Sequence, residues 1–138
     1  MTNAATLPNL LERLRAATGA DILLDAELPV ALGVWTPMRG FVRDDRPEYP
    51  WRWTKKQHIQ WQPHVPYTAS LDAALALVQA KLPGWAVTVT SYARTGLGKA
   101  VIWRNYDGRR EYESNAPTAP LALLCALVTA LIGEDGNG

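Results

Sequence analysis

The sequence predicts a single α+β domain in which helices pack on the faces of an antiparallel sheet of three or more strands. Three features predict it: a leucine-striped helix and a turn that lead into an alternating strand, a hairpin signal between two more strand-like segments, and a long apolar helix near the end. A chain of 138 residues can form one core without disulfides or metals. We therefore expect one domain over 1–138, frayed at 1–5 and 134–138.

The first feature is a helix predicted just after Ser70. Apolar residues recur there at spacings of four, three and four, which places them on one buried face: Leu71, Leu75, Val78 and Leu82. The Ser70 hydroxyl can cap the first turn, and Pro83-Gly84 ends the helix because proline cannot continue its hydrogen bonds.

Two shorter helices are predicted before this one. The first carries a stripe of Leu7, Leu10, Leu11 and Leu14, with Thr6 as its cap and Gly19 closing it. The second is capped by Asp21, repeats a leucine every four residues at Leu24, Leu28 and Leu32, and ends at Gly33. Because proline lacks the backbone N–H, Pro29 predicts a break or kink inside it.

Three strands are predicted after Gly84. Trp85, Val87 and Val89 alternate with smaller or polar residues, and a turn over 94–98 leads to a second strand from 100 to 106. That strand has Val101 and Trp103 on one face and Ile102 on the other. Asp107-Gly108 is typical of a type I′ hairpin turn and predicts a third strand over 109–114, with Arg109, Glu111 and Glu113 facing water.

A nearly uniformly apolar helix is predicted after Thr118, its cap. The stripe of Leu121, Leu124, Cys125, Val128 and Leu131 is widened by Leu123 and Leu127, which indicates a helix buried on most sides. Cys125 is the only cysteine, so it forms no internal disulfide, and its apolar surroundings favour a buried structural thiol over a nucleophile.

The segment 34–66 reads as a proline- and tryptophan-rich irregular insertion. Five prolines and the charged run 43–46 interrupt any apolar period, so most of it is expected to be loop. Residues 40–42 and 49–53 are candidates for short edge strands, where proline is tolerated.

Composition narrows the classes of function. The net charge of +1 argues against a DNA mimic and against a strongly basic nucleic-acid coat. The apolar fraction of 48% is typical of globular proteins, and no apolar run approaches the ~18 residues that span a membrane. The N-terminus lacks a signal-type leader. We expect a soluble intracellular protein with no membrane partner.

Three ordered blocks resemble a known family. LLERLRAATGADILLDAELPVALG, PYTASLDAALALV followed by GW, and APTAPLALLCALVTAL are together similar to the phage ABA-sandwich domain family of small phage proteins of unassigned function. The blocks cover about two-thirds of the chain. The resemblance implies an α/β/α sandwich, a phage origin and residence in the host bacterial cytoplasm, and it supplies no catalytic residue. Pro29 and the stretch 35–62 depart from the family pattern.

No catalytic constellation, cofactor motif or metal set is evident. Gly96-Leu97-Gly98-Lys99 resembles a fragment of a phosphate loop but lacks its first glycine, the Ser or Thr after the lysine, and a following helix, so a hairpin turn is favoured. His58 and His64 have no cysteine or carboxylate at a familiar ligand spacing, which disfavours a metal site. We expect no enzyme, no cofactor and no metal.

The segment 49–67 carries the one candidate site. Three tryptophans within eleven residues alternate with cationic residues, and the candidate ligand-binding set is Trp51, Arg52, Trp53, Lys55, Lys56, His58 and Trp61. Aromatic rings that stack on bases beside cations that hold phosphates are suited to nucleotides or single-stranded nucleic acid. The favoured alternative places Trp51 and Trp53 in the core of a sheet, with the cations solvated.

Two functions follow as hypotheses. The leading one is a non-enzymatic, phage-encoded accessory protein that binds a host or phage protein. The alternative is a binding module or sponge for a nucleotide-type small molecule or single-stranded nucleic acid through residues 49–67. A homo-oligomer is a further expectation, since symmetric partners commonly cover exposed strand edges and surplus tryptophans.

Overall fold

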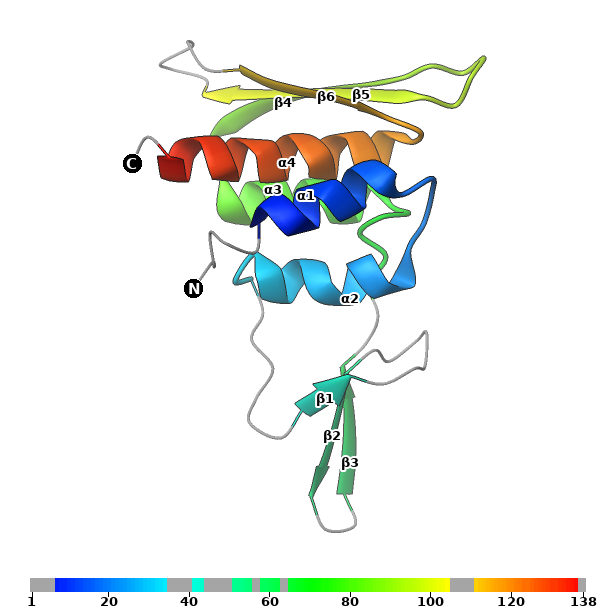
Figure 1. The fold of residues 1–138 in the computed structure, drawn as a ribbon, viewed down its shortest axis with the longest axis vertical. Helices are drawn as coiled ribbons and strands as arrows, with labels where there is room; N and C mark the ends of the chain where they lie inside the picture. Colours follow the sequence, from blue (N-terminus) through cyan, green and yellow to red (C-terminus); the bar gives the residue numbers. More distant parts are fainter. Residues whose placement is uncertain are drawn as a thin grey trace.

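The computed structural model describes residues 7–34, 41–43, 51–55, 58–62, 65–104 and 111–136, and omits the side chains of 22, 26, 41–43, 51–55, 58–62, 135 and 136. The described chain contains four helices and six strands, with the strands in two consecutive runs of three (Figure 1). In chain order they are α1 (Leu7–Ala16), α2 (Ile22–Ala31), β1 (Phe41–Arg43), β2 (Trp51–Lys55), β3 (His58–Gln62), α3 (Leu71–Lys81), β4 (Trp85–Ser91), β5 (Gly98–Arg104), β6 (Glu111–Ala116) and α4 (Ala119–Gly136).

The strands form two separate antiparallel sheets, each of three strands in chain order. In the sheet β4–β5–β6, all seven residues of β4 pair with β5, from Trp85 opposite Arg104 to Ser91 opposite Gly98. Burial alternates along β5 as predicted: Ile102 is fully buried, whereas Val101 and Trp103 on the other face are half-buried. Glu111 and Glu113 are exposed, as expected; Arg109 and the Asp107-Gly108 turn lie outside the described residues.

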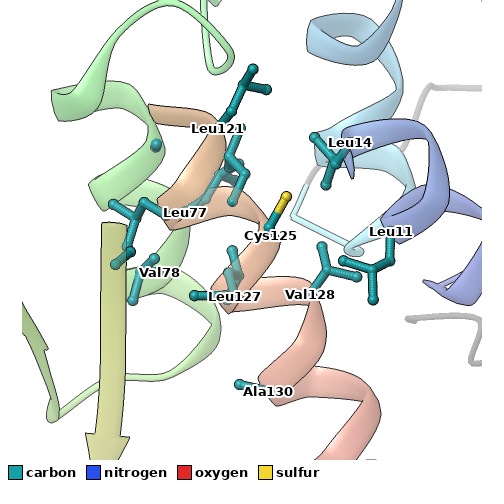
Figure 2. Packing of buried hydrophobic residues seen from close by; sticks show 14 of the residues in the cluster. Leu11, Leu14, Leu77, Val78, Leu121, Cys125, Leu127, Val128 and Ala130 are labelled. Atoms are coloured by element: carbon teal, nitrogen blue, oxygen red, sulfur yellow. The ribbon is translucent and has the colours of Figure 1, made fainter. Parts of the chain in front are cut away.

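Helix α4 is the centre of the core. It packs on all three strands of the β4–β5–β6 sheet and on α1 and α3, and every residue from 121 to 128 is buried (Figure 1). Figure 2 shows Cys125 and Val128 on the side of α4 toward Leu11 and Leu14 of α1, and Leu127 on the side toward α3. A helix enclosed in this way must be apolar all round, which explains its composition.

The buried face of α3 differs from the predicted one. Ser70 caps the helix by accepting from the Ala73 N–H at 3.2 Å, and Gly84 adopts a φ of +85° after it ends, as expected. The buried residues, however, are Ala74, Leu77, Val78 and Leu82, while Leu75 is half-buried and Leu71 is 38% exposed. The prediction for Leu71 was wrong, and Leu77 was missed, because the buried face runs through Ala74, Leu77 and Val78 and is turned away from Leu71.

The sequence predicted a break or kink at Pro29; helix α2 continues through it, so the break does not occur. A proline removes one backbone hydrogen bond. Here two backbone hydrogen bonds stabilise the turn that follows Pro29. The N–H of Gly33 donates to Val30 O and that of Val34 to Pro29 O, at 3.1 and 2.9 Å, and Gly33 has a φ of +74°. This Schellman motif ends the helix at the glycine, where the sequence predicted.

Two helix ends also differ from expectation. α1 ends at Ala16, three residues before Gly19. α4 continues past Gly133 to Gly136, so 134–136 are helical instead of frayed. The reason is at Glu134, whose carboxylate pairs with Arg104 of β5 and accepts from the Tyr112 hydroxyl of β6 at 2.8 Å.

The predicted fold class is confirmed: an antiparallel three-stranded sheet packs against helices in an α+β arrangement. In Figure 1 the four helices lie on one side of that sheet, and the smaller sheet lies beyond α2. Within the described residues no helix covers the other face, so the second helical layer of the α/β/α sandwich implied by the resemblance is not seen there. Among the helices of the described residues, none combines the length and the apolar character needed to cross a membrane.

Candidate binding surface

The segment 34–66 contains the three strands of the small sheet β1–β2–β3, which the sequence predicted only in part. The segments 40–42 and 49–53 correspond to β1 and β2, but β3 (His58–Gln62) was missed. Most of the remaining segment lies outside the described residues, so the expectation of mostly loop stays a prediction. Lys55 pairs with His58, so only two residues, 56 and 57, connect β2 to β3. A connection of two residues is the commonest length in β-hairpins.

The backbone of the small sheet brings together most of the candidate ligand-binding positions. Arg52 is the Cα partner of both Val42 and Trp61, and Trp53 that of Phe41 and Gln60. Paired Cα atoms in an antiparallel sheet lie about 4.5–5.5 Å apart. Lys56 lies outside the described residues, as do the side chains of the other six candidates, Trp51, Arg52, Trp53, Lys55, His58 and Trp61.

The small sheet is attached at both ends to α2. Its N-terminal connection leaves the helix at the Gly33 motif. Its C-terminal connection leads to Thr68, a buried residue whose backbone N–H and hydroxyl both donate to Asp25 Oδ1 at 2.7 Å. The Thr68 hydroxyl also accepts from the Asp21 N–H at 2.8 Å. Residues 34–66 therefore leave from one end of α2 and are fixed again at the other.

The polar node at Thr68 is a buried structural joint. Asp25 is 3% exposed and Thr68 1%. Burial, and then the charge of Asp25, raise the pKa of the neighbouring Tyr67 hydroxyl above its usual 10.0. Buried polar groups need partners, and these groups supply them to one another. Sequence analysis assigned Asp21 correctly as a helix cap, since it accepts from the Leu24 N–H at 3.1 Å, but it gave no signal for Asp25 or Thr68.

A second cluster of side chains, from β4, β5 and β6, packs at the C-terminal end of α4. The sequence analysis did not predict it. The rings of Trp85 and Tyr112 stack with centroids 6.1 Å apart, and the Arg104 guanidinium lies 5.7 Å from the centre of the Trp85 ring. Arg104 and Tyr112 both bind Glu134. A Cβ on Gly133 would lie 2.7 Å from the Tyr112 ring, so the glycine lets the ring rest on the helix. These groups satisfy one another, which favours a structural role.

The described surface also has one open hollow of about 490 Å³ between α1 and α4. It is lined by Pro8, Asn9, Leu11, Glu12, Arg15 and Ile132. The hollow is shallow, and its lining combines three apolar residues with the polar or charged Asn9, Glu12 and Arg15.

The structure bears on two chemistries that the sequence disfavoured, a phosphate loop at 96–99 and a nucleophilic Cys125. Gly96 and Leu97 lie in the turn of the β4–β5 hairpin, where Gly96 has a φ of +79°, and Gly98-Lys99 begin β5, so the hairpin reading is confirmed over the phosphate loop. Cys125 is buried and unpaired with another cysteine, as predicted. Burial, opposed by the nearby Arg15, raises the pKa of its thiol to about 11, which suppresses the nucleophilic thiolate.

Within the described residues, no three His, Cys, Asp or Glu side chains gather as a metal site would require. His64 and the side chain of His58 lie outside that description. Comparisons with models of known protein families, with curated proteins and with solved structures found no match for the chain.

Proposed function

We propose that this chain is a non-enzymatic accessory protein, encoded by a phage, that binds a host or phage protein in the host cytoplasm through the small sheet β1–β2–β3. The phage origin and the location rest on the three sequence blocks that resemble the phage ABA-sandwich family. The binding role rests on the structure of the small sheet.

The observation that carries the proposal is the separation of this sheet from the core. The main contacts of β1, β2 and β3 are with one another, whereas each strand of the larger sheet also packs on α4. A three-stranded sheet is stable on its own only if it has a hydrophobic face or packs against a helix. Its strands nevertheless contain one phenylalanine, three tryptophans and two arginines. Tryptophan, phenylalanine and arginine are enriched at protein interfaces, and tryptophan and arginine dominate their binding energy.

Capture from the bacterial host tests this proposal. Full-length wild-type protein, a Trp61→Ala variant and a Trp103→Ala variant serve as baits in infected and uninfected lysates. Trp61 lies in β3 of the small sheet, and Trp103 is the matched control because it is half-buried on the outer face of the larger sheet. We expect one stoichiometric protein that wild type and Trp103→Ala retain and that Trp61→Ala loses.

Folding must be measured alongside binding. Circular dichroism and thermal melting should show that Trp61→Ala keeps the helical core, because β3 has its main contacts with β2. A bait in which 35–64 is replaced by a short Gly/Ser linker extends the test and should also stay folded. The proposal fails if the captured protein binds the linker variant as well as it binds wild type.

The alternative is a site for a nucleotide or single-stranded nucleic acid on the same sheet. It is supported by the pairing of the Arg52 backbone with Trp61 and of Lys55 with His58, which places cationic and aromatic or imidazole residues at neighbouring positions. Stacking on a tryptophan is worth about 1–3 kcal/mol per base. Tryptophan-fluorescence titration with a nucleotide and oligonucleotide panel tests it.

The ligand-binding and core interpretations of the tryptophans predict different effects of alanine substitution, on binding in the first case and on stability in the second. If Trp51 or Trp53 stacks on a base, alanine at that position weakens binding and leaves the melting temperature unchanged. If either ring is core, the same change costs about 3–5 kcal/mol of stability. Replacing Arg52, Lys55 and Lys56 together should flatten the salt dependence of nucleic-acid binding only on the ligand reading. An absence of quenching across the panel, with both Trp variants destabilised, rules out this alternative.

A further inference from the structure

The two edges of the β4–β5–β6 sheet differ in how they are protected. β6 carries Glu111 and Glu113, both exposed on the outer face, and charged side chains are a common defence against edge-to-edge pairing. β4 reads Trp-Ala-Val-Thr-Val-Thr-Ser and contains no charge, no proline and no glycine. All seven of its residues pair in unbroken register with β5, so the strand has no bulge. β4 thus lacks the features that keep an edge strand unpaired.

The inner side chains of β4 are also incompletely covered. Trp85, Val87 and Val89 point toward α4 and pack on the core, yet each remains half-buried, whereas the equivalent positions of the central strand β5, Ala100 and Ile102, are fully buried. A strand added beside β4 would cover these side chains and satisfy the backbone groups on its free edge.

The composition of β4 matches a second β4 placed antiparallel to it. If the two-fold axis passes through Thr88, all seven residues of each strand overlap. Val87 then lies opposite the partner's Val89 on the inner face, and Thr88 opposite the partner's Thr88 on the outer face. Trp85 faces the partner's Ser91, and Ala86 faces the partner's Thr90. No like charges meet, and β-branched and Thr–Thr cross-strand pairs are favourable.

Antiparallel pairing of two copies of β6 about Glu113 is unfavourable. A two-fold axis through Glu113 places that carboxylate opposite the partner's Glu113. Like charges directly opposite one another destabilise a strand pair. Pairing of β6 about Glu113 therefore brings like charges together, whereas the full-length pairing of β4 about Thr88 does not.

We propose that two copies of this chain associate through β4 to form one continuous six-stranded antiparallel sheet. The contact is isologous and closes on itself, so it produces a dimer and not a filament. It involves the core sheet and is independent of the partner proposed for the small sheet.

Sedimentation across the micromolar range tests the dimer with two exposed-residue variants. Thr88→Lys places two ammonium groups at the two-fold axis, and the matched control Glu111→Lys adds the same side chain to the outer face of β6. We expect a wild-type dimer, a dissociation constant raised about fivefold or more for Thr88→Lys, and no such increase for Glu111→Lys. Melting curves confirm that both variants are folded.

A covalent readout fixes the register. Paired Cα atoms in antiparallel strands lie about 4.5–5.5 Å apart, which suits a disulfide. Under mild oxidation Thr88→Cys should form a disulfide-linked dimer, whereas Glu113→Cys on the opposite edge should not; the native Cys125 is buried and stays reduced. A wild-type monomer throughout the micromolar range, or equal cross-linking of the two cysteine variants, overturns the proposal.

Discussion

The molecule contains two sheets of the same topology in two different settings. Both are antiparallel, and both order their strands as they occur in the chain. The sheet β4–β5–β6 packs on the buried helix α4, while the chain connections of β1–β2–β3 lead to the two ends of α2. The comparison separates what a sheet gains from its own hydrogen bonds from what it gains by covering a core.

The packed sheet is specified by side chains that fit one helix. Ile102 and Ala100 are fully buried under α4, and Gly98 allows the start of α4 to approach the strand. The small sheet has its main contacts within itself, so changes there should act mainly on binding. Changes in the packed sheet should act mainly on folding.

The largest expected effect is the loss of the central buried side chain of β5. Ile102→Ala should lower the free energy of unfolding by about 2–5 kcal/mol, because it leaves a cavity against α4. Val101→Ala is the matched control on the outer face of the same strand and should cost less than half as much. Urea denaturation measures both. Equal losses would mean that α4 does not define the buried face.

The next largest effect is expected at Gly98. A Cβ there would lie 2.5 Å from the backbone N and Cα of Ala119, and neither atom can move without shifting α4. Gly98→Ala should therefore cost about 1–3 kcal/mol through overpacking.

Gly19→Ala provides the control for that change. No atom lies within 4 Å of a Cβ at Gly19, so alanine there should be neutral or slightly stabilising. A neutral Gly98→Ala in thermal melting would contradict the close approach of strand and helix.

The attachment of the small sheet offers a smaller effect. Thr68→Val keeps the shape of the side chain but removes the hydroxyl that joins Asp25 to the Asp21 N–H, at an expected cost of about 1–3 kcal/mol. Hydrogen exchange should rise at 65–70. Thr18→Val, at an exposed position between α1 and α2, should leave stability nearly unchanged. Similar exchange in the two variants would argue against the joint.

The smallest effect is a dependence of core stability on pH. The Cys125 pKa is about 11 in the folded chain and the ordinary value is 9.0, so the unfolded thiol ionises first as pH rises. The resulting stabilisation is complete below pH 9 and is lost between 9 and 11; the raised pKa of Tyr67 acts in the same direction.

Urea denaturation at several values of pH checks this sign. Cys125→Ala should show a shallower fall in stability over the same range than wild type. Native protein should also resist alkylation at pH 8, and rapid modification there would contradict the burial of the thiol.

The larger sheet was predictable because each turn carries a local signal. The segment 94–98 contains two glycines, and Asp107-Gly108 is the preferred pair of a two-residue hairpin. Lys56-Gln57 connects β2 and β3 with no glycine, asparagine or aspartate, so the second hairpin had no local signal and β3 was missed. The small sheet depends on pairing between strands, which a single strand's composition does not report.

Errors within helices have a different origin. The leucine spacing in α3 predicted a stripe that includes Leu71, but the buried face runs through Ala74, Leu77 and Val78. Both faces fit a 3.6-residue period, so spacing alone does not select between them. Pro29 was expected to break or kink α2, yet the helix continues through it and the Gly33 motif supplies hydrogen bonds after it. The joint at Thr68 and the cluster at Glu134 combine residues from distant elements, which no local pattern reveals.

The position of α4 has a consequence for how the chain is made. α1 is complete at Ala16, but the helix that buries its leucines begins at Ala119, about 100 residues later. At a synthesis rate of about 5–20 residues per second, those leucines wait roughly 5–20 s for their partner. A nascent chain stalled before Ala119 should therefore expose them to chaperones, and release of the stall should bury them in a single late step.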